Sequence, residues 1–183
     1  MEETVRIDAL RAIEQMEGEE AALLLRLKAS GGDLRAAVVG QALESLLKLE
    51  GIRALDFART FLVEKDTQTP KELRSTADEV VEEAALALGN SRLPAAVDAL
   101  KEVWTQQPKI IFLQAISTSR QESGFEFLLH LVATARERDA ANALEVLSLH
   151  ADSPEIRAAA LAAVTTRGSA DLRDKYQAKF GAS

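Results

Sequence analysis

Apolar residues recur at intervals of three and four along most of the chain, and glycines, prolines and polar turns divide them into segments of helical length. Each glycine that follows a periodic run, Gly89 and Gly124 included, is interpreted as a helix stop, because glycine adopts the left-handed conformation that closes a helix. The pattern predicts an all-α protein with helices at 4–16, 19–29, 33–50, 52–64, 71–88, 92–105, 109–118, 123–136, 139–150, 154–165 and 169–180.

The same pattern heads several of these segments. TVRIDALRAI at residues 4–13 aligns with the stretch that follows the ADSP turn at 151–154, so that Val5-Arg6 corresponds to Ile156-Arg157. GDLRAAVVGQAL and KELRSTADEVV place an aliphatic residue and an arginine at a helix start once more. The four arginines, Arg6, Arg35, Arg74 and Arg157, are separated by 29, 39 and 83 residues, which suits a two-helix unit if the last gap holds two units. A helix with a single apolar stripe buries it by stacking on neighbours, so a repeat array is expected.

The run VRIDALRAIEQMEGEEAALLLRLKASGGDLR, from Val5 to Arg35, resembles a HEAT repeat of the short type also found in phycobilisome-lyase-like proteins. The clearest copies are residues 4–50 and 139–180. The resemblance implies a right-handed α-solenoid of about five antiparallel helix pairs plus one extra helix. It also implies a single HEAT-like domain over 1–183, which is either a whole protein or a piece of a longer one.

HEAT arrays carry an Asp–Arg ladder between repeats, and by resemblance Asp152 with Arg157 fits it. The pairs Asp33 with Arg35 and Asp66 with Arg74 match its spacing less well. The expected ladder residues are Arg6, Arg35, Arg74, Asp152 and Arg157.

Two segments depart from the repeat pattern. The helix at 123–136 should head a repeat, but it has Glu126 or Phe127 where the arginine would stand. The helix at 109–118 is expected to be the extra helix or half of a degenerate repeat. The repeat register between 105 and 125 therefore stays open.

Charge narrows the range of partners. The net charge is −7, and residues 1–91 hold 18 acidic and 11 basic side chains against 11 of each in 92–183. An acidic surface repels phosphates, and a HEAT-like alkylpurine glycosylase would need a basic groove with several aromatic residues. No stretch approaches the ~18–20 apolar residues of a membrane span, and the start MEETVRIDAL lacks signal-peptide character. We therefore expect a cytoplasmic protein with neither nucleic acid nor membrane as partner.

Candidate chemistry is sparse. The chain has no cysteine, and His130 and His150 lie on different expected helices, His130 beside the core and His150 capping a helix end. The carboxylates of DEVVEEA at 78–84 are expected on a solvated face. The sequence thus predicts no catalytic site, metal or cofactor. The alternative, drawn from the resemblance alone, is a lyase-like role in chromophore or cofactor attachment.

A binding surface is the remaining candidate site. In HEAT geometry the second helix of each pair lines the concave side, which assigns 19–29, 52–64, 92–105, 139–150 and 169–180 to that side. Phe57 and Phe61 would pack between repeats, and Trp104 would lie in the core or at the lip of a groove. Arg53 and Arg59 lie close together in the otherwise acidic N-terminal half of the chain, and they predict a local positive spot that would bind an acidic peptide. The expected function is a non-catalytic protein- or peptide-binding scaffold of unspecified partner and oligomeric state. Its candidate partner-binding residues are Arg53, Asp56, Arg59, Lys101 and Trp104.

Overall fold

The protein is helical throughout the part that the structure describes. A computed structural model gives residues 2–33, 35–63 and 71–181, with the backbone alone for 71–76; helix accounts for 84% of these residues, and they include no strand. The helices are α1 (Glu3–Met16), α2 (Gly18–Gly31), α3 (Ala36–Glu50), the 3-10 turn η1 (Gly51–Ala54), α4 (Leu55–Arg59), α5 (Lys71–Asn90), α6 (Pro94–Gln106), α7 (Ile110–Thr118), α8 (Glu122–Thr134), α9 (Glu137–Leu147), the 3-10 turn η2 (Ser148–His150), α10 (Pro154–Arg167) and α11 (Ala170–Phe180).

Most helices lie where the apolar spacing predicts them, and the segment 52–64 is the clearest exception. It divides into η1 and the five-residue α4. The Thr60 hydroxyl donates to the Phe57 carbonyl at 2.7 Å, and the Phe61 and Leu62 amides donate to carbonyls three residues back. These tighter bonds end the α-helix early.

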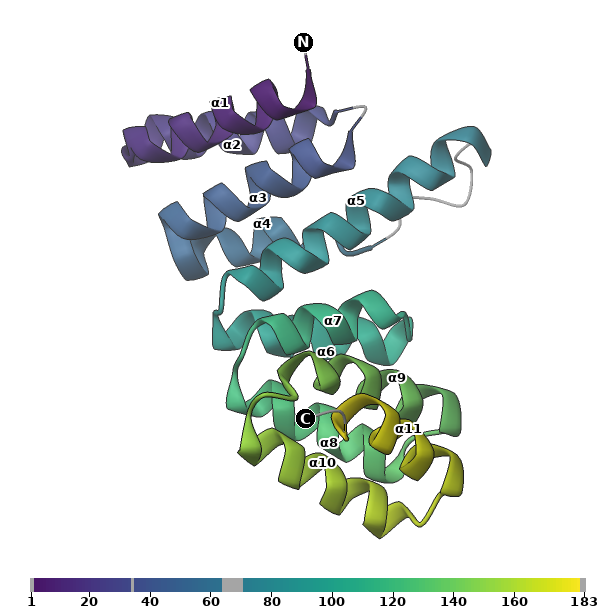
Figure 1. Ribbon diagram of the computed structural model, residues 1–183. Helices are drawn as coiled ribbons and strands as arrows, with labels where there is room; N and C mark the ends of the chain where they lie inside the picture. The colour runs from purple at the N-terminus through teal and green to yellow at the C-terminus, as the bar shows by residue number, and fades with distance from the viewer. Residues whose placement is uncertain (1, 34, 64–70, 182–183) are drawn as a thin grey trace.

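The helices stack in two rows (Figure 1). In the first row α1 packs on α3, α3 on α5, α5 on α7, α7 on α9 and α9 on α11. In the second row α4 packs on α6, α6 on α8 and α8 on α10. α2 packs on α1 and α3, and its Arg26 lies over the Phe57 ring of α4, which places α2 at the head of the second row.

The register between residues 105 and 125 is now defined. α7 belongs to the first row, and α8 is its partner in the second. The turns before α6 and α8 are equivalent: Arg92 and Arg120 have φ of 53° and 54°, and the preceding Ser91 and Ser119 each donate to a carbonyl three residues back at 2.6 Å. The segment 109–118 is therefore the first helix of an ordinary pair.

This register overturns part of the expected helix assignment. The helices at 139–150 and 169–180 correspond to α9 and α11, and both lie in the first row rather than on the side of the second helices. α8 lies in the second row, so it does not head a pair, and neither does α10, although α10 carries the expected repeat-heading Arg157. α10 packs on α8 and continues the second row.

Two glycines interpreted as helix stops lie inside helices instead. A Cβ on Gly89 of α5 would collide with the Ala115 carbonyl oxygen of α7, and a Cβ on Gly124 of α8 would lie 3.1 Å from an Ile116 methyl carbon. These glycines therefore allow neighbouring helices to approach closely. The core beside them is fully buried aliphatic and aromatic packing, as at Leu88 and Phe112.

Candidate partner-binding face

The candidate partner-binding residues all lie along the second row. We call its outward side, formed by Leu23 and Arg26 of α2, Arg53 of η1, Phe57 and Arg59 of α4, Lys101 and Trp104 of α6 and Phe127 of α8, the second-row face. Arg53 and Asp56 are exposed, whereas Arg59, Lys101 and Trp104 are half-buried. The five predicted residues thus share a row of adjoining helices.

Arg53 stands at a groove between α2 and η1. The groove has a volume of about 400 Å³ and is lined by Gly18, Glu19, Ala22, Leu23, Arg26, Leu49, Glu50 and Arg53. Leu23 is 59% exposed at its edge. Arg26 is held in place, since it forms an ion pair with Glu50 and lies 4.9 Å from the Phe57 ring centroid. Arg53, in contrast, has no hydrogen bond or ion pair to another residue of the described ranges.

Cation–aromatic contacts continue along the row. Lys101 Nζ lies 5.7 Å from the Phe127 ring centroid, in the same manner as Arg26 over Phe57. The Trp104 ring meets the Phe127 ring edge to face at 5.5 Å. Each such contact stabilises the folded chain by on the order of 0.5–1 kcal/mol. Trp104 therefore sits at the edge of the packing and remains half-exposed.

Sequence reasoning missed Arg26 and Phe127 as members of this face. Phe127 lies where the repeat pattern called for an arginine at a helix start. Its contact with Lys101 and Trp104 could not be predicted, because the pattern did not decide whether its helix belongs to the first or the second row. Arg26 has no local signal, because Phe57 and Glu50 reach it only after α2 and α4 have packed.

The expected positive spot is neutralised. Arg59 Nη2 donates to Glu102 Oε2 of α6 at 2.6 Å, with both side chains partly exposed. Glu19 and Glu50 also line the groove beside Arg53, and Asp56 is exposed three residues after Arg53. The second-row face is therefore mixed in sign, with Arg53 as its unpaired cation among the described residues.

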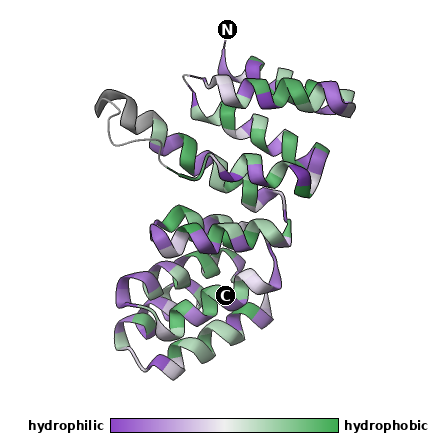
Figure 2. Cartoon of the chain, turned by 180° about the vertical axis from the view of Figure 1, so that it is seen from behind, coloured by the Kyte–Doolittle hydropathy of each residue, from purple (hydrophilic) through white to green (hydrophobic). Residues whose placement is uncertain are grey.

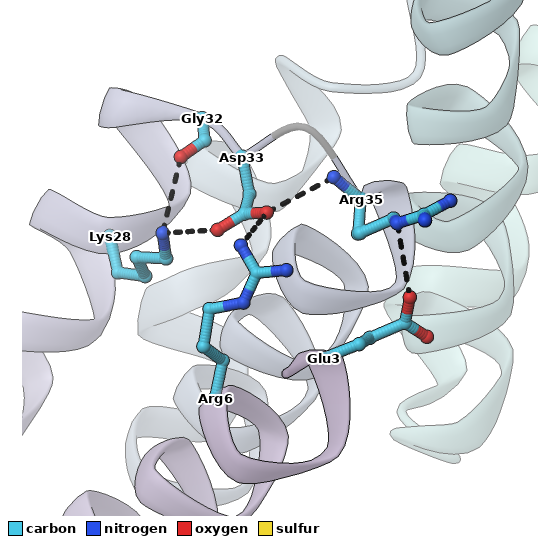
Figure 3. Close-up of polar contacts among 6 residues, drawn as sticks. All are labelled: Glu3, Arg6, Lys28, Gly32, Asp33 and Arg35. Carbon is cyan, nitrogen blue, oxygen red and sulfur yellow. Dashed lines mark hydrogen bonds and ion pairs between the residues drawn. The ribbon is translucent and has the colours of Figure 1, made fainter. Parts of the chain in front are cut away.

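One predicted ladder position has a different partner from the one expected (Figure 3). The Asp33 carboxylate, 4% exposed, accepts from Arg6 Nη1 at 2.6 Å, Lys28 Nζ at 2.6 Å and the Arg35 amide at 3.0 Å. The Arg35 guanidinium points away, with its Nε 3.6 Å from Glu3. Burial alone would raise the Asp33 pKa, but the bonds from Lys28 and the Arg35 amide and the charges of Lys28 and Arg6 outweigh it and hold the pKa below its usual value.

Arg157, the arginine of the second expected ladder pair, closes the turn before its own helix. Arg157 donates through Nε and Nη2 to the Ala151 carbonyl oxygen at 3.1 and 2.7 Å, and Asp152 is exposed. Tyr176 of α11 donates its hydroxyl to the Arg157 carbonyl at 3.1 Å, which links α10 to α11. The side chains of Asp66 and Arg74 lie outside the described residues.

The histidines take different positions. His130 is exposed and lies 3.2 Å from Thr134 Oγ1, so the expectation that it packs beside the core is wrong; the buried positions of α8, such as Leu128 and Leu131, lie on its other side. His150 Nε2 lies 3.0 Å from Ser117 Oγ. Ser117 is fully buried, so no substrate can reach this Ser–His contact, and it serves packing between α7 and η2.

The expectation that the carboxylates at 78–84 lie on a solvated face holds for three of the four. Asp78, Glu79 and Glu82 are exposed, and Asp78 pairs with Lys109 at 3.2 Å. Glu83 is half-buried against Gly40, where burial, followed by repulsion from neighbouring carboxylates, raises its pKa. Within the described ranges, no three His, Asp or Glu side chains gather as a metal site would require.

No helix in the described part of the chain combines the length and apolar character needed to cross a membrane. Comparison with known protein families finds no match, and neither curated proteins nor solved structures give one. Function must therefore be inferred from the geometry of the chain itself.

Proposed function

We propose that this chain is a non-catalytic binding module that holds a peptide or protein segment on its second-row face. The scaffold would be a short right-handed α-solenoid of the HEAT type in the cytoplasm. Polar contacts between successive helix pairs support the repeat, because they join residues one two-helix unit apart. These contacts are Arg6–Asp33, Glu14–Ser45, Asp78–Lys109, Arg92–Gln121, Ala135–Arg167 and Glu145–Lys179, with separations of 27 to 34 residues.

The observation that carries the proposal is the exposed Arg53 guanidinium at the groove between α2 and η1. The apolar residues of the groove lining are Ala22, Leu23 and Leu49, which stand beside the charged Glu19, Arg26 and Glu50. A guanidinium can bind a carboxylate through two parallel hydrogen bonds, and an apolar wall beside it can bury a neighbouring aliphatic or aromatic side chain. The groove therefore suits a segment in which an acidic residue adjoins an apolar one.

The surroundings of Arg53 favour a fixed site. Arg26 is held by Glu50 and Phe57, and Arg59 by Glu102, so neither must reorganise when a ligand enters. A preformed site loses less conformational entropy on binding. Arg53 is then the cation that selects the ligand.

The bound segment would be short. Packed helices lie about 10 Å apart, so the row from α2 to α6 spans roughly 20 Å, the length of about six extended residues. Such a segment would reach from the Arg53 groove to Trp104, whose half-buried ring offers a second apolar contact. The net charge of −7 further supports a protein or peptide partner over a nucleic acid.

A phage-displayed library of random peptides, selected on the immobilised full chain, tests this proposal. We expect enriched peptides to share an acidic residue next to an apolar one. Arg53→Glu should weaken their binding by at least about tenfold in titration calorimetry, because a like charge replaces the carboxylate partner. The matched control is Arg173→Glu on α11, an exposed arginine far along the chain, which should leave affinity unchanged.

Two results would overturn the proposal. One is that no peptide is enriched over the uncoated support. The other is that enriched peptides bind parent, Arg53→Glu and Arg173→Glu chains equally well, which would move the binding site away from the second-row face.

A further inference from the structure

Three successive turns on one edge of the stack share a backbone conformation. Figure 1 shows the connections from α3 to η1, from α5 to α6 and from α7 to α8 at the left of the stack, and Figure 2 shows them at the right after the half-turn. Each contains one left-handed residue: Gly51, Arg92 and Arg120 have φ of 57°, 53° and 54°. The Gln121 side-chain amide donates to the Arg92 carbonyl oxygen at 2.8 Å, so the last two turns are neighbours. We call the turns at 50–53, 90–93 and 119–121 the turn edge.

Every turn of this edge carries one exposed arginine. Arg53, Arg92 and Arg120 have no side-chain hydrogen bond or ion pair to another residue of the described ranges. In contrast, Arg26 and Arg59 of the second row are each paired with a carboxylate. No other charged residue stands within two positions of Arg53 or Arg92 in the sequence. The turn edge therefore presents a row of three positive charges that the described part of the chain does not neutralise.

The backbone indicates that two of these side chains are there for an external contact. Arg92 and Arg120 hold the conformation for which Gly51 is suited, and a Cβ in this region lies too close to the following carbonyl oxygen. Neither guanidinium gains a polar contact in the described ranges that would offset this strain. Strain of this kind is retained at ligand-binding positions. A partner that binds the two arginines would account for their presence where glycine fits better.

The spacing of the row defines the shape of the partner. α4, α6 and α8 pack in succession, and packed helices lie about 10 Å apart, so neighbouring arginines of the row are separated by roughly that distance. A polyproline II segment has about three residues per turn and rises about 3.1 Å per residue, so every third side chain returns to the same side after about 9 Å. Carboxylates at every third position of such a segment would match the row.

We propose that the turn edge binds an acidic segment of the partner in a polyproline II conformation, with acidic residues at every third position that pair in turn with Arg53, Arg92 and Arg120. A guanidinium holds a carboxylate through two parallel hydrogen bonds, which gives each pair a fixed geometry. This assignment rests on the proposed function at Arg53 and extends that site past the groove. A partner that also reaches Trp104 would place the carboxylate bound to Arg53 between its two portions.

Neighbouring carboxylates select spaced acidic residues over a continuous acidic run. Asp56 is exposed three residues after Arg53, and Glu122 is exposed two residues after Arg120. A run of acidic residues would bring like charges against these two side chains, whereas residues spaced by three need not. The net charge of −7 likewise opposes the dense phosphates of a nucleic acid.

Parallel selections from a phage-displayed library test the turn edge. Random peptides of about 16 residues, roughly 50 Å long in this conformation, are selected on the full chain and on the Arg92→Gly, Arg120→Gly double variant. Peptides selected on the parent should carry acidic residues at intervals of three. Those selected on the double variant should keep an acidic residue next to an apolar one, for the Arg53 groove, and lose the spacing.

Titration calorimetry measures the contribution of the row. Peptides selected on the parent should bind the double variant about tenfold more weakly, at about threefold for each exposed ion pair, and this difference should shrink as salt rises. The matched control is Arg136→Gln, which removes an exposed arginine from the turn between α8 and α9 and should leave affinity unchanged. An equal loss in the control would show unspecific charge attraction and overturn the proposal.

Thermal unfolding separates binding from a structural role. Glycine relieves the left-handed strain, so the double variant should keep its melting temperature or gain up to about 3 °C while it loses affinity. A lowered melting temperature, unchanged affinity, or sub-micromolar binding of duplex DNA that the double variant loses would each overturn the acidic-segment assignment. A loss with Arg53→Glu but not with the double variant would overturn the turn edge alone. A loss with the double variant but not with Arg53→Glu would support Arg92 and Arg120 and overturn the groove.

Discussion

Asp33 shows how one side chain can fix a junction between helices. Its carboxylate accepts hydrogen bonds from Arg6 of α1, Lys28 of α2 and the amide of Arg35, which come from three different segments. The carboxylate is covered chiefly by these partners, which are themselves 26% and 35% exposed at Arg6 and Lys28. The contact therefore stabilises the turn between α2 and α3 without placing a charge deep in the core.

Asp33→Asn should lower the free energy of unfolding by about 1–2 kcal/mol at neutral pH, as for a partly solvated charged hydrogen bond. The folded-state pKa of Asp33 lies below its unfolded value, so its contribution is complete above about pH 4 and is lost as pH falls through the folded pKa. Urea unfolding of parent and variant should therefore converge under acid conditions. The control Asp8→Asn, at a side chain 72% exposed, should change little at any pH. A constant difference between parent and Asp33→Asn at every pH would contradict this account.

The sequence predicted that Asp33 matters but assigned it the wrong arginine side chain. Arg35 is only two residues away, so the pattern favoured it, whereas Arg6 is brought to Asp33 from 27 residues earlier by the packing of α1 on α3. Similarly, Arg53 was identified from its charge and helix position, but the pair between Arg59 and Glu102 depends on the packing of α4 on α6. Side-chain partners across helices are set by tertiary contacts that local spacing does not encode.

At the scale of the elements, apolar periodicity located the helices well, because each helix has one buried stripe. It could not assign the partner of the helix at 109–118, since a stripe indicates that a face is buried and does not say which helix buries it. The same limit applies to Gly89, which stands before Asn90 and Ser91 in a stretch typical of a helix stop. In the structure it provides the close approach of α5 to α7.

Gly89→Ala should lower the free energy of unfolding by about 2–4 kcal/mol, because the added methyl group must displace the backbone of α7. Gly31→Ala is the matched control. A Cβ there meets no atom within 4 Å, so this change should be neutral or stabilise by up to about 1 kcal/mol through helix propensity. Thermal and denaturant unfolding measure both. Equal effects from the two substitutions would show that α5 and α7 do not meet at Gly89.

At the scale of the whole molecule, the second row gathers the features that a peptide would contact. Its second-row face combines fixed charges, aromatic edges and the Arg53 groove. Leu23 and Leu27 of α2 are four residues apart and both exposed, so they lie on the same side of that helix and extend the apolar surface from the groove along α2.

Hydrogen–deuterium exchange of the full chain, with and without a library-selected peptide, tests the central claim that the second-row face is the binding site. We expect the peptide to slow amide exchange in α2 and in residues 49–59, which form and adjoin the groove, and to leave α9 and α11 unchanged. Protection confined to the first row, in α3, α5 or α9, would contradict the account.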